Sequence, residues 1–311
     1  MNPVKPEHFA SFFESCHDCI PFDWQQALAS RVVAQGWPDV LALPTAAGKT
    51  AVLDVALFAL AAQAALPPDR RTAPRRIVFV VDRRVVVDAT AERARKIAKA
   101  LCHPDSEILR NMREALLSYG GETPLHCAEL RGGMWRDERW ARTPLQPTVL
   151  VSTVDQVGSR LLHRGYGLSP SAWPIHAGLL ANDTLLILDE AHLSRAFEDT
   201  LGWIAKYRLW AERPLALPFH VVRMSATPGA STGVFPEDAS LVYDDRRLAP
   251  RLSRPKHATL LPVEKASDFP KRCAETAQRF AQPGKTVAVI VNRVATARAI
   301  HERIVRSTGD G

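Results

Sequence analysis

The sequence predicts an α/β protein built around a doubly wound, parallel β-sheet. Short runs of apolar and β-branched residues alternate with helical patterns along most of the 311 residues, as expected of repeated strand–helix units. The runs are continuously apolar, which is typical of strands that are covered on both faces. The predicted strands are residues 40–43, 77–81, 148–152, 184–188 and 220–224.

Helical patterns lie between these strands, and the repeat ends after residue 227. We predict helices at residues 25–34, 50–64, 85–100, 154–164 and 193–209. Residues 228–262 are rich in proline, glycine, serine and charge, which indicates a loop or linker. A helix (268–281), a strand (286–291) and a final helix (294–305) follow. This last fragment is too small to bury its own sheet and is expected to begin a second α/β domain.

The composition indicates a folded protein without a membrane anchor. Hydrophobic residues make up 46% of the chain, and the net charge of +7 favours a polyanionic partner. The longest apolar segment, 51–66, contains Asp54 and is too short to span a bilayer. No secretory signal begins the sequence, and the five scattered cysteines suit a reducing compartment. We therefore expect a cytoplasmic protein.

The segment "LPTAAGKT" follows the first predicted strand and precedes a helix. A phosphate-binding loop requires this context, because backbone N–H groups and the helix N-terminus together bind phosphate oxygens. Lys49 can reach the β- and γ-phosphates of a nucleotide, and the Thr50 hydroxyl can bind Mg²⁺. A chance match to the strand-to-helix sequence is the alternative, since Leu43 stands where the strict pattern has glycine. The candidate nucleotide-binding residues are Thr45, Ala46, Ala47, Gly48, Lys49 and Thr50.

Two adjacent carboxylates follow another predicted strand. Asp189 and Glu190 end the run "TLLILDE", and open α/β sheets bind ligands at the carboxyl ends of their strands. Asp189 can hold the metal, and Glu190 can orient or deprotonate the attacking water. The alternative is a helix cap or turn. "MSATP" places Ser225 and Thr227 at the end of the next strand.

In this order, "PTAAGKT", "LDEAH" and "MSATP" resemble the first motor lobe of superfamily 2 helicases with DEAH lettering. The resemblance implies a RecA-like domain that uses ATP and Mg²⁺, in which His192, Ser225 and Thr227 couple the nucleotide to the nucleic acid. "PFDWQQAL" resembles the adenine-reading element of these proteins. It implies that Gln25 reads the adenine edge and that Phe22 or Trp24 stacks nearby. The family usually has glycine where this chain has Ala46, and alanine is strained there if the backbone needs a positive φ.

A narrower resemblance is to the CRISPR-associated helicase-nuclease of type I interference, in the subtype whose nuclease domain is C-terminal. The segments that carry it are "LRGGMWRDERW", "VLVSTVDQVGSRLLHRGYG", "PIHAGLL" and "LLILDEAHLS". It implies single-stranded DNA and an RNA-guided surveillance complex as partners. The implied domains are an N-terminal extension (1–20), a RecA-like motor lobe (21–232), a linker (233–262) and an incomplete second RecA-like lobe (263–311).

Loops after several strands are the candidate nucleic-acid contacts. Arginine side chains could pair with phosphates, glycine backbones could approach the sugar-phosphate chain, and hydroxyl groups could donate hydrogen bonds. Trp135 and Trp140 could stack on bases or pack beneath a surface helix. The candidate contacts are Arg83, Arg84, Arg131, Gly132, Gly133, Thr153, Asp155 and Gln156.

Two other features limit the functional assignment. His17-Asp18 spells a dipeptide of metal-dependent nucleases, but the further ligands that such a site needs are not recognisable nearby, so we reject it. The second-lobe segment "QxxGRxxR", which supplies an arginine finger in the helicases that the chain resembles, is also absent from the sequence. The alternatives are another superfamily 2 DNA translocase, a repair or restriction helicase, or a non-catalytic nucleic-acid-binding remnant.

Overall fold

The computed structural model describes residues 3–81, 84–130, 137–190, 194–226, 232–255 and 257–309, with the side chains of 84–86 and 307–309 left out. Contacts divide the chain into two compact units, Met1–Arg254 and Pro255–Gly311.

A parallel β-sheet forms the centre of the first unit and confirms the predicted fold class. Within the described residues it has seven strands in the order β3-β4-β2-β5-β6-β1-β7, and all the pairings are parallel. Two short edge strands, β3 and β7, had not been predicted. The strands are β1 (Val40–Ala42), β2 (Arg76–Val81), β3 (His126–Leu130), β4 (Thr148–Thr153), β5 (Thr184–Asp189), β6 (Phe219–Ser225) and β7 (Val234–Phe235).

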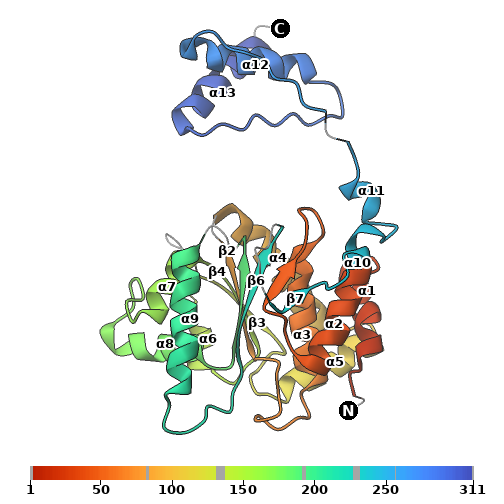
Figure 1. Cartoon of the computed structure of the whole chain (residues 1–311), viewed down its shortest axis with the longest axis vertical. Coiled ribbons are helices and arrows are strands. Elements are labelled where there is room, and N and C mark those ends of the chain that lie inside the picture. Colours follow the sequence, from red (N-terminus) through yellow and green to blue (C-terminus); the bar gives the residue numbers. More distant parts are fainter. Residues whose placement is uncertain are drawn as a thin grey trace. The chain divides into compact units, whose positions relative to one another are not determined.

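Helices cover both faces of the sheet (Figure 1). One layer consists of α1 (Phe9–His17), α2 (Asp23–Gln35), α3 (Val52–Ala62), α4 (Arg84–Cys102) and α5 (Glu107–Leu117). The other consists of α6 (Arg139–Arg142), α7 (Val154–Leu161), α8 (Trp173–Ala181) and α9 (Arg195–Leu209). Short 3-10 turns are η1 (Pro6–His8), η2 (Lys49–Ala51) and η3 (Pro170–Ala172). None of the helices in the described ranges is long and apolar enough to cross a bilayer.

The continuous apolar runs are explained by this two-sided burial. Along β2, Ile77 and Phe79 pack into the core beneath α1–α5, whereas Val78 and Val80 pack beneath α6–α9. Successive side chains of a strand point to opposite faces, so every residue of an inner strand needs an apolar side chain when both faces are covered.

A buried ionic network fixes α1 and α4 against α3. Asp54 of α3 is fully buried, and its two oxygens lie 2.6 Å from His17 Nε2 and 2.6 Å from Arg93 Nε. A buried carboxylate is tolerated only when it is paired. His17 of the His17-Asp18 dipeptide therefore has a structural partner.

The predicted linker at residues 233–262 is not a simple linker. β7 pairs with β1, and the short helices α10 (Ser240–Tyr243) and α11 (Ala249–Leu252) follow it. Val242 and Leu248 are buried in the core beneath α1–α5. Asp245 accepts a 2.8 Å hydrogen bond from the backbone N–H of Asp23, at the start of α2. The sequence pattern missed this packing because the buried apolar residues are few and have no regular period.

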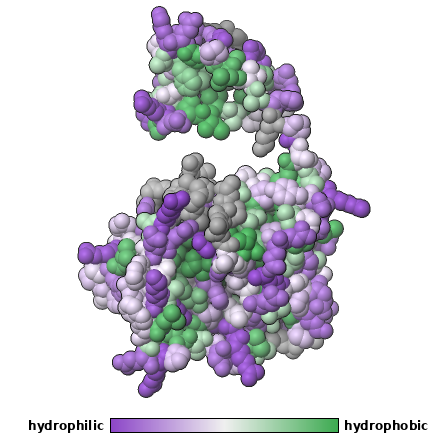
Figure 2. Space-filling model, viewed as in Figure 1, coloured by the Kyte–Doolittle hydropathy of each residue, from purple (hydrophilic) through white to green (hydrophobic). Residues whose placement is uncertain are grey.

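The second unit contains η5 (Ala266–Asp268), α12 (Phe269–Phe280) and α13 (Val294–Gly309). Both helices were predicted, but residues 286–291 do not form the predicted strand. Ile290 is 92% exposed, and a strand requires a hydrogen-bonded neighbour that this unit does not provide in its described part. Figure 2 shows hydrophobic residues gathered on the visible face of this unit.

We predict that Leu248→Ala lowers the free energy of unfolding by about 2–5 kcal/mol, because it leaves a cavity in the core. Leu260→Ala is the matched control, since Leu260 belongs to the same predicted linker and is 94% exposed; it should have almost no effect. Urea unfolding followed by circular dichroism measures both. Equal stability of the two variants would contradict the packing of residues 240–252 on the first unit.

Candidate functional site

The candidate site lies at the carboxyl ends of β1, β5 and β6. In the sheet Ala42 is opposite Ser225, and Asp189 is opposite Met224. The Leu43 N–H also donates to the Ser225 carbonyl over 3.2 Å. Pairing of β1 and β5 with the same strand, β6, therefore places the loop after β1 next to the acidic pair at the end of β5.

Side chains from α2 hold the loop from below. The Trp24 indole N–H donates to the Ala47 carbonyl over 3.0 Å, and Gln25 Nε2 donates to the Gly48 carbonyl over 3.3 Å. Gln25 Oε1 accepts from the Phe22 N–H over 2.9 Å. We predicted that Phe22 or Trp24 stacks near the adenine; Trp24 is fully buried, which excludes it, and stacking by Phe22 stays a prediction. Gln25 touches the loop, and its contact with adenine stays a prediction.

The loop uses the left-handed backbone conformation twice. Ala46 has φ 68° and Gly48 has φ 78°. Glycine adopts this conformation freely, whereas alanine is strained by about 1–2 kcal/mol. A Cβ at Gly48 would also lie 3.1 Å from Gln25 Nε2. Ala46 therefore stands where glycine is the unstrained residue.

Most of the loop residues are exposed to solvent, and one is buried. Thr45, Ala46 and Gly48 are exposed, whereas Ala47 is fully buried. Thr50 is half-buried in η2, which continues into α3. Thr45 is thus accessible to solvent and Thr50 partly so, whereas the Ala47 side chain packs into the core.

Lys49 meets the acidic pair directly. Its Nζ lies 3.0 Å from Glu190 Oε1, and both side chains are partly shielded from solvent, with exposed fractions of 12% and 35%. Glu190 has φ 51°, so the chain turns sharply where β5 ends. This ion pair joins two segments that are 141 residues apart in sequence.

Asp189 has a raised pKa. Burial is the main cause, Lys49 opposes it, and the negative charge of Glu190 adds to it. A carboxylate that is kept partly dry beside a second carboxylate is suited to binding a cation. Oxygen ligands from Asp189 and Thr50 are the kind that Mg²⁺ prefers.

The predicted nucleic-acid contacts are only partly described. Thr153 ends β4 and is 8% exposed, and Asp155 is exposed in the first turn of α7. Gln156 is buried, and its Oε1 accepts a hydrogen bond from Arg160 Nη1 over 2.8 Å. Its side chain therefore makes an internal contact. Outside the described residues lie Arg83, Arg131, Gly132, Gly133, His192 and Thr227, and the side chain of Arg84.

The tryptophan of α6 packs inside the protein. Trp140 is 1% exposed, and its ring meets His176 edge-on at 4.8 Å. The packing alternative is therefore confirmed for Trp140, whereas Trp135 lies outside the described residues. Burial and, to a smaller extent, the nearby Arg160 together lower the pKa of His176 to about 4.

Residues 244–252 also contribute to the surroundings of the loop, which the sequence pattern did not predict. The guanidinium carbons of Arg247 and Arg251 each lie 5.5 Å from the centre of the Phe22 ring. Phe22 in turn lies against Gly48 of the loop. Only the Arg-rich composition of this segment could have drawn attention to it.

We predict that Ala46→Gly raises the free energy of unfolding by about 1 kcal/mol, because it relieves the positive φ. Ala47→Gly is the matched control in the same loop. It should lower the free energy of unfolding by about 1–2 kcal/mol, since it removes a buried methyl group and raises the conformational entropy of the unfolded chain. Thermal melting of both variants measures the difference. A stabilised Ala47→Gly or a destabilised Ala46→Gly would show that the loop adopts another conformation.

We predict that Asp189→Asn raises the melting temperature of the metal-free protein at neutral pH. The pKa of Asp189 is higher in the folded state than the usual 3.8. The contribution of the protonated Asp189 to the free energy of unfolding is therefore complete below pH 3.8 and is lost as the pH rises through the folded-state pKa. Asparagine does not titrate, so its advantage should grow between about pH 4 and pH 7. Asp69→Asn, at an exposed loop position, should show no such gain. A gain that does not depend on pH would contradict the explanation.

A DEAD/DEAH box helicase family model matches residues 24–233. The comparison with curated proteins found no match. The chain is similar in structure to the Mycobacterium smegmatis helicase Lhr bound to ssDNA and AMP-PNP, with 15% identity and a TM-score of 0.53 over 96% of this chain and 35% of that one.

Two further structures are more distant. The DEAD-box helicase Mss116 bound to ssRNA and UDP-BeF has 18% identity, a TM-score of 0.46 and coverage of 73% of this chain and 39% of that one. The yeast DEAD-box splicing factor Prp28 has 17% identity, the same TM-score and coverage of 73% and 46%. The chain thus spans less than half of each of these proteins, and Lhr supports the fold alone. Because the family model covers more than half of the chain and includes both the loop and the acidic pair, the chain belongs to the DEAD/DEAH box helicase family.

Proposed function

We propose that this chain is the ATP-binding part of an ATP-dependent nucleic-acid motor. The contact between Lys49 and Glu190 is the observation that carries the proposal. It brings a cation from a helix N-terminus and a pair of carboxylates to one edge of a parallel sheet, where open α/β sheets bind ligands. The half-buried Thr50 and exposed Thr45 flank the same loop.

Each residue has a separate role in the proposed hydrolysis. The loop N–H groups and Lys49 bind the phosphates and neutralise the charge that develops on the γ-phosphoryl group. Thr50 and Asp189 hold Mg²⁺, which supplies further charge neutralisation when bound. Glu190 accepts a proton from the attacking water, whose oxygen bonds to phosphorus as the bond to ADP breaks.

The ion pair also suggests how the site is kept inactive without nucleotide. While Glu190 Oε1 is paired with Lys49 Nζ at 3.0 Å, this oxygen is engaged by the cation rather than by an attacking water. Phosphate oxygens compete for Lys49 when ATP binds. We infer that this exchange frees Glu190 to accept the proton.

For the nucleic acid, we propose single-stranded DNA that runs across the loops after β2, β3 and β4. Thr153 and the exposed Asp155 belong to this edge in the described part of the chain. Contacts with the sugar-phosphate chain would suit sequence-independent movement. We further propose that residues 263–311 begin a second RecA-like lobe that follows residues 21–232 and the segment 233–262.

We propose a role in type I CRISPR interference, with an RNA-guided surveillance complex as the recruiting partner. Three segments that resemble the interference helicase-nuclease meet in one core, where Trp140, Leu161 and Leu180 pack together beneath the sheet. The Trp140–His176 contact joins two of them. Shared packing of separated segments supports a common structural unit. Another superfamily 2 DNA translocase, or a repair or restriction helicase, uses the same motor chemistry, and co-purification with surveillance-complex proteins would separate these functions.

We predict that Lys49→Ala weakens the binding of a fluorescent ATP analogue with Mg²⁺ by at least about tenfold, because a charge-assisted contact with phosphate is lost. Lys99→Ala, at an exposed position of α4, is the control and should bind as the unaltered chain does. Equal binding by the Lys49 and Lys99 variants would refute the assignment. Single-stranded DNA binding without any nucleotide binding by the unaltered chain would favour the non-catalytic remnant.

A further inference from the structure

The outer face of α9 is unusually aromatic. The helix buries Phe197 and Leu201 beneath the sheet. On its solvent side Trp203 is 50% exposed, and Trp210, which directly follows the helix, is 71% exposed. Clustered large apolar side chains on a surface mark an interaction site, because water contact with them is unfavourable.

The exposed residues follow a helical spacing. At about 100° per residue, six positions fall within an arc of about 100° on the side away from the core. Lys206 Nζ lies 4.3 Å from the centre of the Trp203 ring, so its charge is held on this face. We call these residues the α9 stripe: Arg195, Asp199, Gly202, Trp203, Lys206 and Trp210, all of them exposed.

The α9 stripe is complementary to itself. If a second α9 lies antiparallel across a twofold axis between Gly202 and Trp203, each residue of the stripe faces a partner that suits it. Asp199 faces Lys206 of the other copy and can form an ion pair. Arg195 faces Trp210 and can form a cation–π contact.

The centre of the stripe allows close approach. Gly202 faces Trp203 of the other copy, and nothing lies within 4 Å of the place where a Cβ at Gly202 would be. A large ring can therefore lie over a position without a side chain, and the same contact occurs twice about the axis. Contacts in which two residues exchange roles define a twofold interface.

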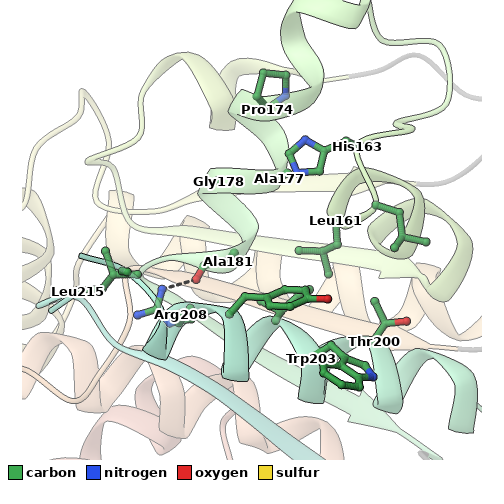
Figure 3. A pocket seen from close by; sticks show the side chains of 14 residues that line it. Leu161, His163, Pro174, Ala177, Gly178, Ala181, Thr200, Trp203, Arg208 and Leu215 are labelled. Atoms are coloured by element: carbon green, nitrogen blue, oxygen red, sulfur yellow. Dashed lines mark hydrogen bonds between the residues drawn. The ribbon is translucent and has the colours of Figure 1, made fainter. Parts of the chain in front are cut away.

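Neighbouring surfaces leave the stripe accessible. Trp203 stands at the rim of a groove between α9 and the α7–α8 region, with a volume of about 660 Å³ and no acidic residue among those that line it (Figure 3). Arg208 lies on the inner side and donates to the Ala181 carbonyl over 2.5 Å. The charges available to a partner on the stripe are therefore those of Arg195, Asp199 and Lys206.

We propose that two copies of this chain associate through the α9 stripe, with the two α9 helices antiparallel. The ordered series of cation, anion, small residue, aromatic ring, cation and aromatic ring supports a second copy as the occupant, because its reversal matches each member with its complement. One helix pair forms a smaller interface than the roughly 1,200 Å² of a standard stable one, so we expect a weak association. It is independent of the proposed nucleotide site.

Charge exchange tests the proposal in the full chain. Sedimentation equilibrium at protein concentrations up to about 100 µM should show a monomer–dimer equilibrium. Asp199→Lys and Lys206→Asp should each weaken it at least about tenfold, because like charges then meet twice across the axis. The double variant, which exchanges the two charges, should restore association to near the original level. Lys99→Asp on α4, which covers the opposite face of the sheet, is the matched control.

Three results would overturn the proposal: a monomer at all concentrations, a dimer whose affinity the single variants leave unchanged, or a double variant no better than the single ones. Trp203→Ala provides a second variant without a charge change, and it should also weaken the dimer. Its half-exposed ring means that the fold is kept, which circular dichroism checks. Loss of nucleotide binding would count against the proposed motor function alone and would leave the dimer result unaffected.

Discussion

The ion pair between Lys49 and Glu190 is the contact on which the geometry of the candidate site depends. It exists because β1 and β5 both pair with β6, so that segments 141 residues apart end side by side. The surroundings then fix each partner. The loop carbonyls of Ala47 and Gly48 are held by α2, and the sharp turn at Glu190 directs that side chain back toward the loop. A small displacement of either strand would separate the two charges.

The site is arranged at some cost to stability, as is common where function requires strained or charged groups. Ala46 holds a backbone conformation that disfavours a Cβ. Asp189 is kept partly dry beside a second carboxylate, which raises its pKa. Two other buried carboxylates of the first unit are each paired with basic side chains. Asp54 is bound by His17 and Arg93, and Asp183 is bound by Arg71 and Arg75. The pKa of Asp183 is lowered whereas that of Asp189 is raised, which supports the proposal that Asp189 binds a cation.

The two helical layers serve different purposes. The layer of α1–α5 forms the larger core and supports the loop through α2 and α3. The layer of α6–α9 joins the segments that carry the narrower resemblance and presents the α9 stripe outward. α9 begins only five residues after Glu190, so one short connection links the acidic pair to the proposed contact between copies. Residues 240–252, which resemble a linker in composition, pack on the first layer and place two arginines beside Phe22.

The sequence by itself determined the features that depend on local pattern. Continuous apolar runs indicated strands buried on both faces, and the order of the loop, the acidic pair and Ser225 indicated which ends of the strands carry chemistry. The possible strain at Ala46 was also predictable, because it follows from the absence of glycine at one position. Only the tertiary structure decided which of these side chains are buried and which face solvent. Trp24 supports the loop from inside and Trp140 fills the core, although tryptophan is a residue type that can stack on bases. Gln156 binds Arg160, and residues 286–291 form no strand in spite of their apolar β-branched sequence. In each case the outcome depends on neighbours that are distant in the chain, and a local pattern carries no information about whether those neighbours are present.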